Sequence, residues 1–517
     1  MRLPDFSKRK PVWIARGVLL TVVAMAVVSA LSGCVNYAGI RDDRKIASPD
    51  KFETRQSLPD EHGQWPTLSW AQQFGDPQLP ALIDEALRGS PTIDAALARI
   101  NKARSYVGEA DAARYPNVSG SYSWTRARLP ENSVIPPPAA GTWTNLNNAF
   151  VHASWDLDLW GKQREGLKQA ISQEKAAEAE AEAVRIALAA SVASAYNQLA
   201  RLYALHDIQA REVGNRQDIG SVTERRVRAG LDTDVERQTA HGETSTTQST
   251  VSGLDGQILA VRYQLAALLG AGPDRGNAIA RPTFAGLDTG TPVMTLPDHL
   301  PADLISRRPD IVAAYWRVDA ALHDVKVTKA EFYPDVNLSV DAGLSALGWG
   351  RLLQTSARTL IAGPAIHLPI FDAGALRAQL KGRYADFDAD VAHYDETLTN
   401  ALSDVASQVA RIRAADRQLV DARQALDAQT TAYKLALIRY RAGLIEQLSL
   451  LRADDNRLAA ETSVVNLEMD RRDMQIALIK ALGGGFDATH DTTPGTDTPI
   501  PGQTTATAVP NVVVSQH

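Results

Sequence analysis

The sequence contains a single cysteine, Cys34, among its 517 residues. One cysteine excludes an intrachain disulfide framework and a cysteine-rich metal site. The ten histidines are scattered, and the chain has no His-Glu-x-x-His motif, nucleophile elbow or phosphate-binding Gly-Lys-Ser/Thr pattern. Gly483-Gly484-Gly485 lacks the strand-to-helix setting of a phosphate loop and predicts the end of a helix instead. The sequence therefore offers no group of residues that would carry an enzymatic reaction.

The N-terminus also lacks an apolar run long enough for a membrane-spanning helix. Five basic residues occur among the first 16, and the apolar run that follows covers only residues 17–30. A bilayer span needs about 20 apolar residues, so a cleaved secretory signal is favoured over a retained transmembrane helix. Removal of residues 1–33 leaves 49 basic and 59 acidic residues, a formal charge of −10. This balance argues against nucleic-acid binding, which requires a basic surface.

The signal ends in Leu31-Ser32-Gly33-Cys34, which resembles the bacterial lipobox. In that motif the cysteine is diacylated and becomes the first residue of the mature chain. The alternative is a free or buried thiol without a role in anchoring. Val35 follows the cysteine, so the Asp that often retains lipoproteins at the inner membrane is absent. We therefore predict a covalent lipid on Cys34 and sorting to the outer membrane.

The rest of the chain is an internal duplication. Residues 91–96 match residues 309–314, and Tyr115-Pro116 matches Tyr333-Pro334, both at an offset of 218 residues. Matches in the same order along the chain indicate a repeated structural unit, so the repeat is identified before single helices and strands are assigned. Two further pairs match at an offset of 213 residues: 226–231 with 439–444, and Leu269-Gly270 with Leu482-Gly483.

Each half predicts a helix, a β-hairpin and two long helices. Helices of residues 91–114 and 309–331 begin at a proline and end at Tyr-Pro, where the ring of proline interrupts helical hydrogen bonding. Apolar and alanine residues then recur at spacings of three and four over the long segments, which is typical of coiled coils. The predicted domains are a signal peptide (1–33), an anchored tether (34–80), repeat 1 (81–272, with strands at about 117–127 and 148–160 and long helices over 161–270), a linker (273–300), repeat 2 (301–485, with strands at about 335–345 and 361–372 and long helices over 374–482) and a disordered tail (486–517).

The four predicted strands have the length and alternation of membrane strands. A tilted strand crosses a bilayer in about 9–11 residues, and small polar residues alternate with apolar ones as one wet face and one lipid face require. An ordinary soluble hairpin is the alternative for either pair alone. Closed membrane barrels begin at about eight strands, and an open sheet in lipid would leave unpaired edges. Several chains must therefore share one barrel, and symmetry allows two, three or four.

Several of these motifs together resemble the outer-membrane factor family, the TolC-like channels, and within it the lipoprotein branch that serves drug-efflux pumps. The resemblance covers about residues 60–485. It rests on Cys34, the two Tyr-Pro junctions, residues 155–161, residues 369–374 and the paired Arg-Ala-Gly-Leu turns.

The resemblance implies a mainly α-helical homotrimer with a twelve-stranded β-barrel in the outer membrane. A long α-helical tunnel would extend into the periplasm, where an adaptor and an inner-membrane transporter dock. The channel would be a passive exit duct for drugs or other small molecules, opened by that docking. It would have no enzymatic activity, and no cofactor beyond the lipid on Cys34.

The resemblance also places a periplasmic gate just after the second turn. Leu448 matches an apolar ring position, and Arg452 stands where a family member can carry an acid, with Asp455 three residues later. Arg452 and Asp455 would meet on one helix face or reach a neighbouring protomer. Asp232 and Asp234 would add carboxylates after the first turn. The alternative is that these charges only solvate a helix end. The adjacent Asp454-Asp455 is not predicted to act as a carboxylate pair, because neighbours on a helix do not face each other.

The turns themselves are the predicted docking sites for the adaptor: Arg228, Ala229, Gly230 and Leu231 in the first half, and Arg441, Ala442, Gly443 and Leu444 in the second. Two other functions were weighed against the channel. A periplasmic coiled-coil scaffold lipoprotein would explain the helices and the anchor, but not four strands of membrane length. A lipid-anchored hydrolase lacks catalytic residues.

Overall fold

A computed structural model describes residues 37–47, 51–54, 56–58, 62–132, 136–137, 140–283, 296–297 and 300–488. The predicted signal peptide, Cys34 and most of the predicted tail lie outside these residues. The described chain forms two compact units, one built from the described residues of 37–45, 102–174 and 316–392 and the other from the remaining described segments. Within the described residues, no helix combines the length and apolar character needed to cross a membrane.

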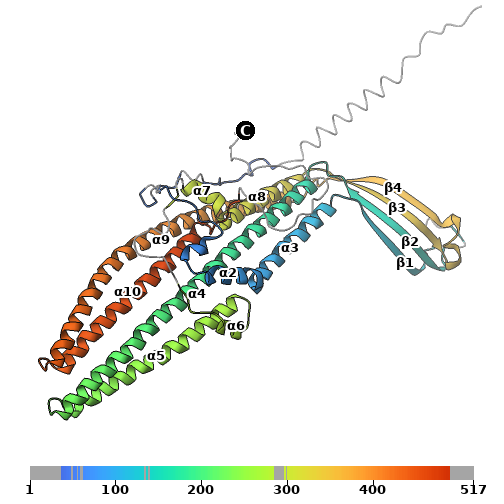
Figure 1. The fold of residues 1–517 in the computed structure, drawn as a ribbon. Coiled ribbons are helices and arrows are strands. Elements are labelled where there is room, and N and C mark those ends of the chain that lie inside the picture. Colours follow the sequence, from blue (N-terminus) through green and yellow to red (C-terminus); the bar gives the residue numbers. More distant parts are fainter. Residues whose placement is uncertain are drawn as a thin grey trace, which may run out of the picture. The chain divides into compact units, whose positions relative to one another are not determined.

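The first unit contains one antiparallel sheet of four strands in the order β1-β2-β3-β4 (Figure 1). The strands are β1 (Asn117–Arg128), β2 (Trp143–Asp156), β3 (Asp335–Leu347) and β4 (Arg358–His367). The predicted second strand was misplaced: it begins at Trp143 rather than 148, and residues 157–160 are not part of it. Residues 157–160 instead lead into the next helix, and Asp158 accepts hydrogen bonds from the backbone of Gln163 and Arg164 at 3.1 and 3.0 Å.

The register separates an apolar face of the sheet from a polar one, because directly paired residues share a face and neighbours alternate. Ser119, His152 and Asp341 are paired across three strands on one face. His152 Nδ1 lies 2.8 Å from Asp341 Oδ1. The opposite face carries mostly apolar side chains, and in the single chain these are exposed: Val118, Tyr122, Trp124, Val151, Leu360 and Ile366.

The duplication is exact in helix length. Helices α3 (Pro91–Ala112) and α8 (Pro309–Ala330) have 22 residues each. Helices α4 (Lys162–Arg228) and α9 (Ala375–Arg441) have 67 each, and α5 (Asp234–Leu268) and α10 (Gln447–Ala481) have 35 each. At 1.5 Å per residue, a 67-residue helix is about 100 Å long. The shorter elements are η2 (Trp70–Phe74), α2 (Gln78–Gly89), α6 (Pro273–Asn277), α7 (Leu300–Arg307), η3 (Trp349–Arg351) and η4 (Thr355–Ala357).

The second unit contains the hairpins α4–α5 and α9–α10, each closed by a glycine turn (Figure 1). Gly230 and Gly443 have φ values of 70° and 75°, a left-handed conformation that costs other residues energy. In both turns the residue after the glycine donates its N–H to a carbonyl five residues earlier, from Leu231 to Arg226 and from Leu444 to Arg439, each at 2.9 Å. The two predicted turns are therefore the same structure.

The core of the second unit lies between α2, α4, α5 and α10. Tyr196 and Leu199 on α4, Leu265 on α5 and Ile479 on α10 are buried there. Alanines fill much of the α4 contribution, which lets the helices approach closely. The predicted glycine stop follows α10, where Gly483, Gly484 and Gly485 all have positive φ.

Candidate periplasmic gate

An arginine, an aspartate and a tyrosine connect the two hairpins beside their turns. Arg226 on α4 donates from Nε to Asp232 Oδ2 at 2.8 Å and from Nη2 to Asp232 Oδ1 at 2.9 Å. The hydroxyl of the fully buried Tyr440 on α9 donates to Asp232 Oδ2 at 3.2 Å. The Arg226 guanidinium also lies over the Tyr440 ring, 4.9 Å from its centroid. We call these three residues the turn link.

Two polar residues extend the turn link to α10. The Tyr440 hydroxyl lies 3.0 Å from Thr223 Oγ1, and Gln447 Nε2 donates to Thr223 Oγ1 at 2.9 Å. The hydrogen bonds from Arg226 lower the pKa of Asp232, and they outweigh its partial burial. The turn link thus favours an ionised Asp232 and fixes α4 against α9 and α10.

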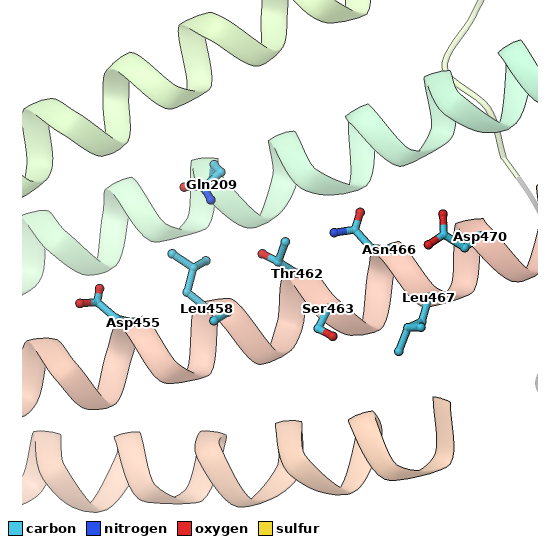
Figure 2. Close-up of a pocket in the computed structure, with 9 residues that line it drawn as sticks. Gln209, Asp455, Leu458, Thr462, Ser463, Asn466, Leu467 and Asp470 are labelled. Carbon is cyan, nitrogen blue, oxygen red and sulfur yellow. The ribbon is translucent and has the colours of Figure 1, made fainter. Parts of the chain in front are cut away.

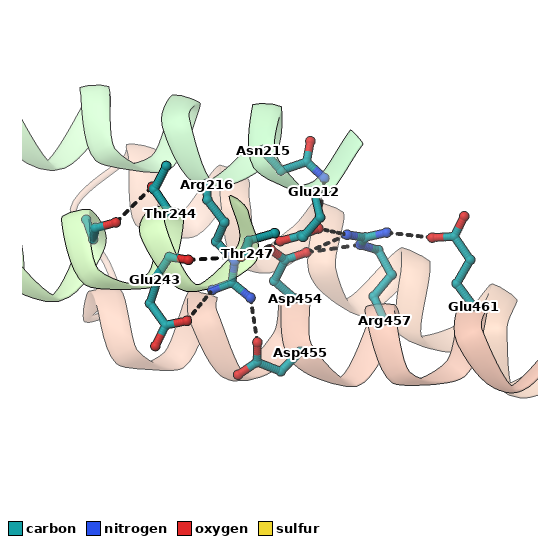
Figure 3. Close-up of polar contacts among 11 residues, drawn as sticks. Glu212, Asn215, Arg216, Glu243, Thr244, Thr247, Asp454, Asp455, Arg457 and Glu461 are labelled. Carbon is teal, nitrogen blue, oxygen red and sulfur yellow. Dashed lines mark hydrogen bonds and ion pairs between the residues drawn. The ribbon is translucent and has the colours of Figure 1, made fainter. Parts of the chain in front are cut away.

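A second group of charges, farther from the turns, joins α4 to α10 (Figure 3). Glu212 and Arg216 come from α4, and Asp454 and Arg457 come from α10; we call these four the buried charge cluster. Glu212, Arg216 and Asp454 are 1%, 3% and 0% exposed. Arg457 Nη2 donates to Glu212 Oε2 at 2.5 Å and to Asp454 Oδ1 at 2.8 Å. Arg216 Nε donates to Glu212 Oε1 at 2.8 Å and lies 3.6 Å from Asp454 Oδ2.

Residues at the edge of the buried charge cluster bring further charges to it. Asp455 accepts from Arg216 Nη2 at 2.5 Å, and Glu461 accepts from Arg457 Nη1 at 3.0 Å. On α5, Glu243 lies 4.0 Å from Arg216 Nη1. On α9, the Tyr433 ring centroid lies 5.1 Å from the Arg457 guanidinium. Charges from α4, α5 and α10 and an aromatic ring from α9 therefore meet at this level.

The predicted gate residues of α10 lie on one exposed face of that helix. Leu448 is 52% exposed, and Arg452 is also exposed. The predicted contact of Arg452 with Asp455 is not formed within the chain, because Asp455 pairs with Arg216 instead. In the part of the chain that the structure describes, Arg452 forms no ion pair. A contact of Arg452 with a neighbouring protomer stays a prediction.

The other two predicted acids differ in setting. Asp232 is central to the turn link, whereas Asp234 pairs at 2.9 Å with Arg237 on the surface of α5, where its side chain is 73% exposed. The burial of Asp454 was not predicted. Asp454 and Asp455 do point differently, but Asp454 is buried and approaches both Glu212 and Arg216 from the facing helix.

The sequence-based predictions did not include Tyr440 or the buried charge cluster, although the sequence contains a pattern that points to each of them. Within the matched hexapeptides, Tyr440 aligns with Val227, so the polar hydroxyl occurs in one half only. Glu212 and Arg216 are four residues apart, and Asp454 and Arg457 are three apart, which are the spacings of charge pairs on one helix face. Such pairs usually face solvent, and only the facing helix shows that these are buried.

The predicted docking turns are accessible. All eight residues, 228–231 and 441–444, are exposed, with Leu231 and Leu444 at 67% and 69%. Exposed leucines at two equivalent turns give each hairpin an apolar tip. Binding of an adaptor to these turns stays a prediction.

A groove of about 610 Å³, lined by polar side chains and by Leu458, Ala459 and Leu467, follows α10 away from the buried charge cluster (Figure 2). Gln209 on α4 and Thr462, Ser463 and Asn466 on α10 line it, with Asp455 near one end and Asp470 near the other. Both acids are neutralised, Asp455 by Arg216 and Asp470 by Arg201 at 2.6 Å. The groove is therefore accessible to water, and both of its acids are paired with arginines.

Comparison with known proteins identifies the family. The family model described as outer membrane efflux protein matches residues 82–271 and 300–484, which are the two halves of the duplication. The chain is 32% identical over 370 residues to the fusaric acid resistance protein FusA of Burkholderia cepacia, covering 70% of this chain and 68% of FusA. It is 29% identical to the multidrug resistance outer membrane protein MdtP of Escherichia coli K12, covering 91% of this chain and 97% of MdtP.

Solved structures agree. The crystal structure of the outer membrane protein VceC from Vibrio cholerae is 34% identical in sequence and superposes with a TM-score of 0.74, covering 82% of this chain and all of VceC. The predicted resemblance, the mainly helical fold with a four-stranded antiparallel sheet, and the outer-membrane location are thereby confirmed. The chain belongs to the outer membrane efflux protein family.

Proposed function

We propose that three copies of this chain form one channel-tunnel, the exit duct of a tripartite efflux pump in the outer membrane. The observation that carries the proposal is the four-stranded sheet with one apolar and one polar face on a chain that also contains two 67-residue helices. Four strands cannot close a membrane barrel alone, and three chains supply twelve. A scaffold lipoprotein without a pore gives no reason for an exposed apolar sheet face.

The cargo in this proposal is drugs or other small organic molecules. FusA and MdtP are named for fusaric acid resistance and multidrug resistance, which supports cargo of that class. A periplasmic adaptor docks on the exposed turns 228–231 and 441–444, and an inner-membrane transporter supplies the energy. The chain itself acts as a conduit: its two hairpins hold the periplasmic end closed until the adaptor and transporter dock.

Reconstitution into planar bilayers tests the channel. The purified protein gives discrete single-channel currents, and a strain that lacks its gene becomes sensitive to drugs until the gene is restored. Lipid binding without any current would contradict the duct and favour the scaffold. Currents without any drug phenotype would leave the pore but refute its place in a drug-efflux pump.

We also propose that Cys34 carries the lipid anchor. Two acyl chains give stable membrane attachment, whereas a single chain is marginal. Cys34→Ser is expected to lose palmitate label and still to partition into membranes through the sheet. Retained label in that variant would refute the assignment.

A further inference from the structure

The buried charge cluster contains two carboxyl groups packed close together out of water. Glu212 from α4 and Asp454 from α10 lie between the guanidinium groups of Arg216 and Arg457. Asp454 Oδ2 is buried and accepts no hydrogen bond from the described residues, and Arg216 Nη1 donates none. A buried carboxyl oxygen without a donor is costly. A proton shared between the two carboxyl groups supplies the missing donor.

The position of this proton is set by burial and by the facing acid. Burial, and then the neighbouring Asp454, raise the pKa of Glu212 to about 7, against the smaller opposing effects of Asn215 and Arg216. A carboxyl group that is neutral near pH 7 is expected where two acids share a low-dielectric site. The folded state therefore holds a proton at Glu212 under conditions in which the unfolded chain has released it.

The two arginines and the tyrosine beside Glu212 keep their charge state near neutrality. Arg216 and Arg457 have raised pKa values despite burial, because Asp455, Asp454 and Glu212 surround them, so both stay cationic. Burial raises the pKa of Tyr433 on α9, which keeps the phenol neutral. The remaining facing groups are Glu243 on α5 and Asp455 and Glu461 on α10, each in contact with one of the two arginines.

We propose that Glu212 and Asp454 form a proton-operated latch between α4 and α10, which binds the two hairpins together while it holds a proton and loosens when the proton leaves. The latch is distinct from the turn link. Glu212 precedes Arg226 by 14 residues, which is about 21 Å along α4. The hairpins are thus held at two levels, of which the level farther from the turns responds to pH around neutrality.

The direction of the pH effect follows from the raised pKa of Glu212. A group whose pKa is raised on folding binds more protons in the folded state, so its contact is strongest at low pH and weakens as the pH rises through about 7. Each latch then changes the ratio of closed to open tips by up to about tenfold per pH unit above that midpoint.

Single-channel recording at pH values from about 5.5 to 8.5 tests the latch, which rests on the proposed channel function for this readout. The wild-type trimer is expected to conduct more as the pH rises through about 7. Glu212→Gln, which keeps the shape and a hydrogen-bond donor without ionising, is expected to stay at the low-pH conductance throughout. Asp454→Asn is expected to move the midpoint to lower pH by about one unit or more, because the facing negative charge is gone.

Asp218→Asn is the matched control, since Asp218 is exposed on the same helix six residues after Glu212. It is expected to follow the wild-type curve. Wild-type conductance that does not change with pH, or a Glu212→Gln trimer with the wild-type midpoint, overturns the latch. Absence of current at every pH would instead contradict the channel itself. Trimer assembly of each variant is checked by size before recording, and the wild-type titration decides the question if either variant fails to assemble.

Discussion

At the scale of single residues, two acids connect the same two hairpins with opposite responses to pH. The pKa of Asp232 is lowered by Arg226, so its contribution is present above the unfolded-state pKa and is lost as the medium becomes acidic. The pKa of Glu212 is raised, so its contribution is lost as the medium becomes alkaline. Both contacts are formed together only between these two limits, from mildly acidic pH up to about 7.

The turn link predicts unequal effects for two nearby acids. Asp232→Asn removes the charge that holds Arg226 and Tyr440, and is expected to cost about 1.5–3 kcal/mol of tip stability and to raise conductance, because hydrogen bonds to a partly buried charged group are lost. Asp234→Asn, whose partner Arg237 is on the surface, is expected to change stability by less than about 1 kcal/mol. Thermal dissociation of the trimer and single-channel currents compare the two. Equal effects would show that the link to Tyr440 does not hold the tip.

The exposed face of α10 gives a second residue-scale prediction. Leu448→Ala combined with Arg452→Ala is expected to raise the conductance of the isolated trimer. Both side chains are exposed in one chain, so Leu448 can pack against the neighbouring protomers and Arg452 can pair with an acid of one of them. Cells that carry the variant should become sensitive to large antibiotics that the intact channel excludes. Unchanged conductance with normal trimer yield would place the gate elsewhere.

At the scale of elements, the two turns depend on glycine for a reason that the sequence already indicates. Gly230 and Gly443 are left-handed, and an alanine in that conformation costs about 1–2 kcal/mol. Gly230→Ala and Gly443→Ala are therefore each expected to lower the dissociation temperature of the trimer. Gly214→Ala, inside α4 with open space around it, is expected to raise it, since glycine weakens a helix interior. An increase with the turn variants would contradict the assigned turn geometry.

The sequence predicted the helices and strands better than it predicted the contacts between helices. Repeated motifs and the Tyr-Pro junctions located both short helices to within two residues of their ends, because proline acts locally on the backbone. Strand β2 was displaced because its aromatic residues continue past Asp156 into a segment that leaves the sheet. The burial of Asp454 was not predicted because its partners Arg216 and Glu212 are 238 and 242 residues earlier in the chain, and no local pattern shows which helix faces it.

At the scale of the whole molecule, the single chain has an unfinished sheet. Strands β1 and β4 are each paired on one side within the chain, and unpaired strand edges do not persist in lipid. The detergent-solubilised protein is therefore expected to sediment as a trimer in analytical ultracentrifugation. A stable monomer or dimer would refute the shared barrel. A trimer that still forms after the sheet residues are deleted would show that the helices alone direct assembly.

The equal helix lengths of the two halves restrict which insertions and deletions the chain can tolerate. A deletion of seven residues in α4 alone would shorten that arm by about 10 Å and leave its turn out of level with the turn after α9. A deletion that is not a whole number of helical repeats would also rotate every later side chain away from its neighbour. Insertions and deletions therefore have to occur in both helices of a hairpin, and in both hairpins. The match to MdtP along 97% of its length at 29% identity is what is expected where substitutions are tolerated in these arms and changes of length are not.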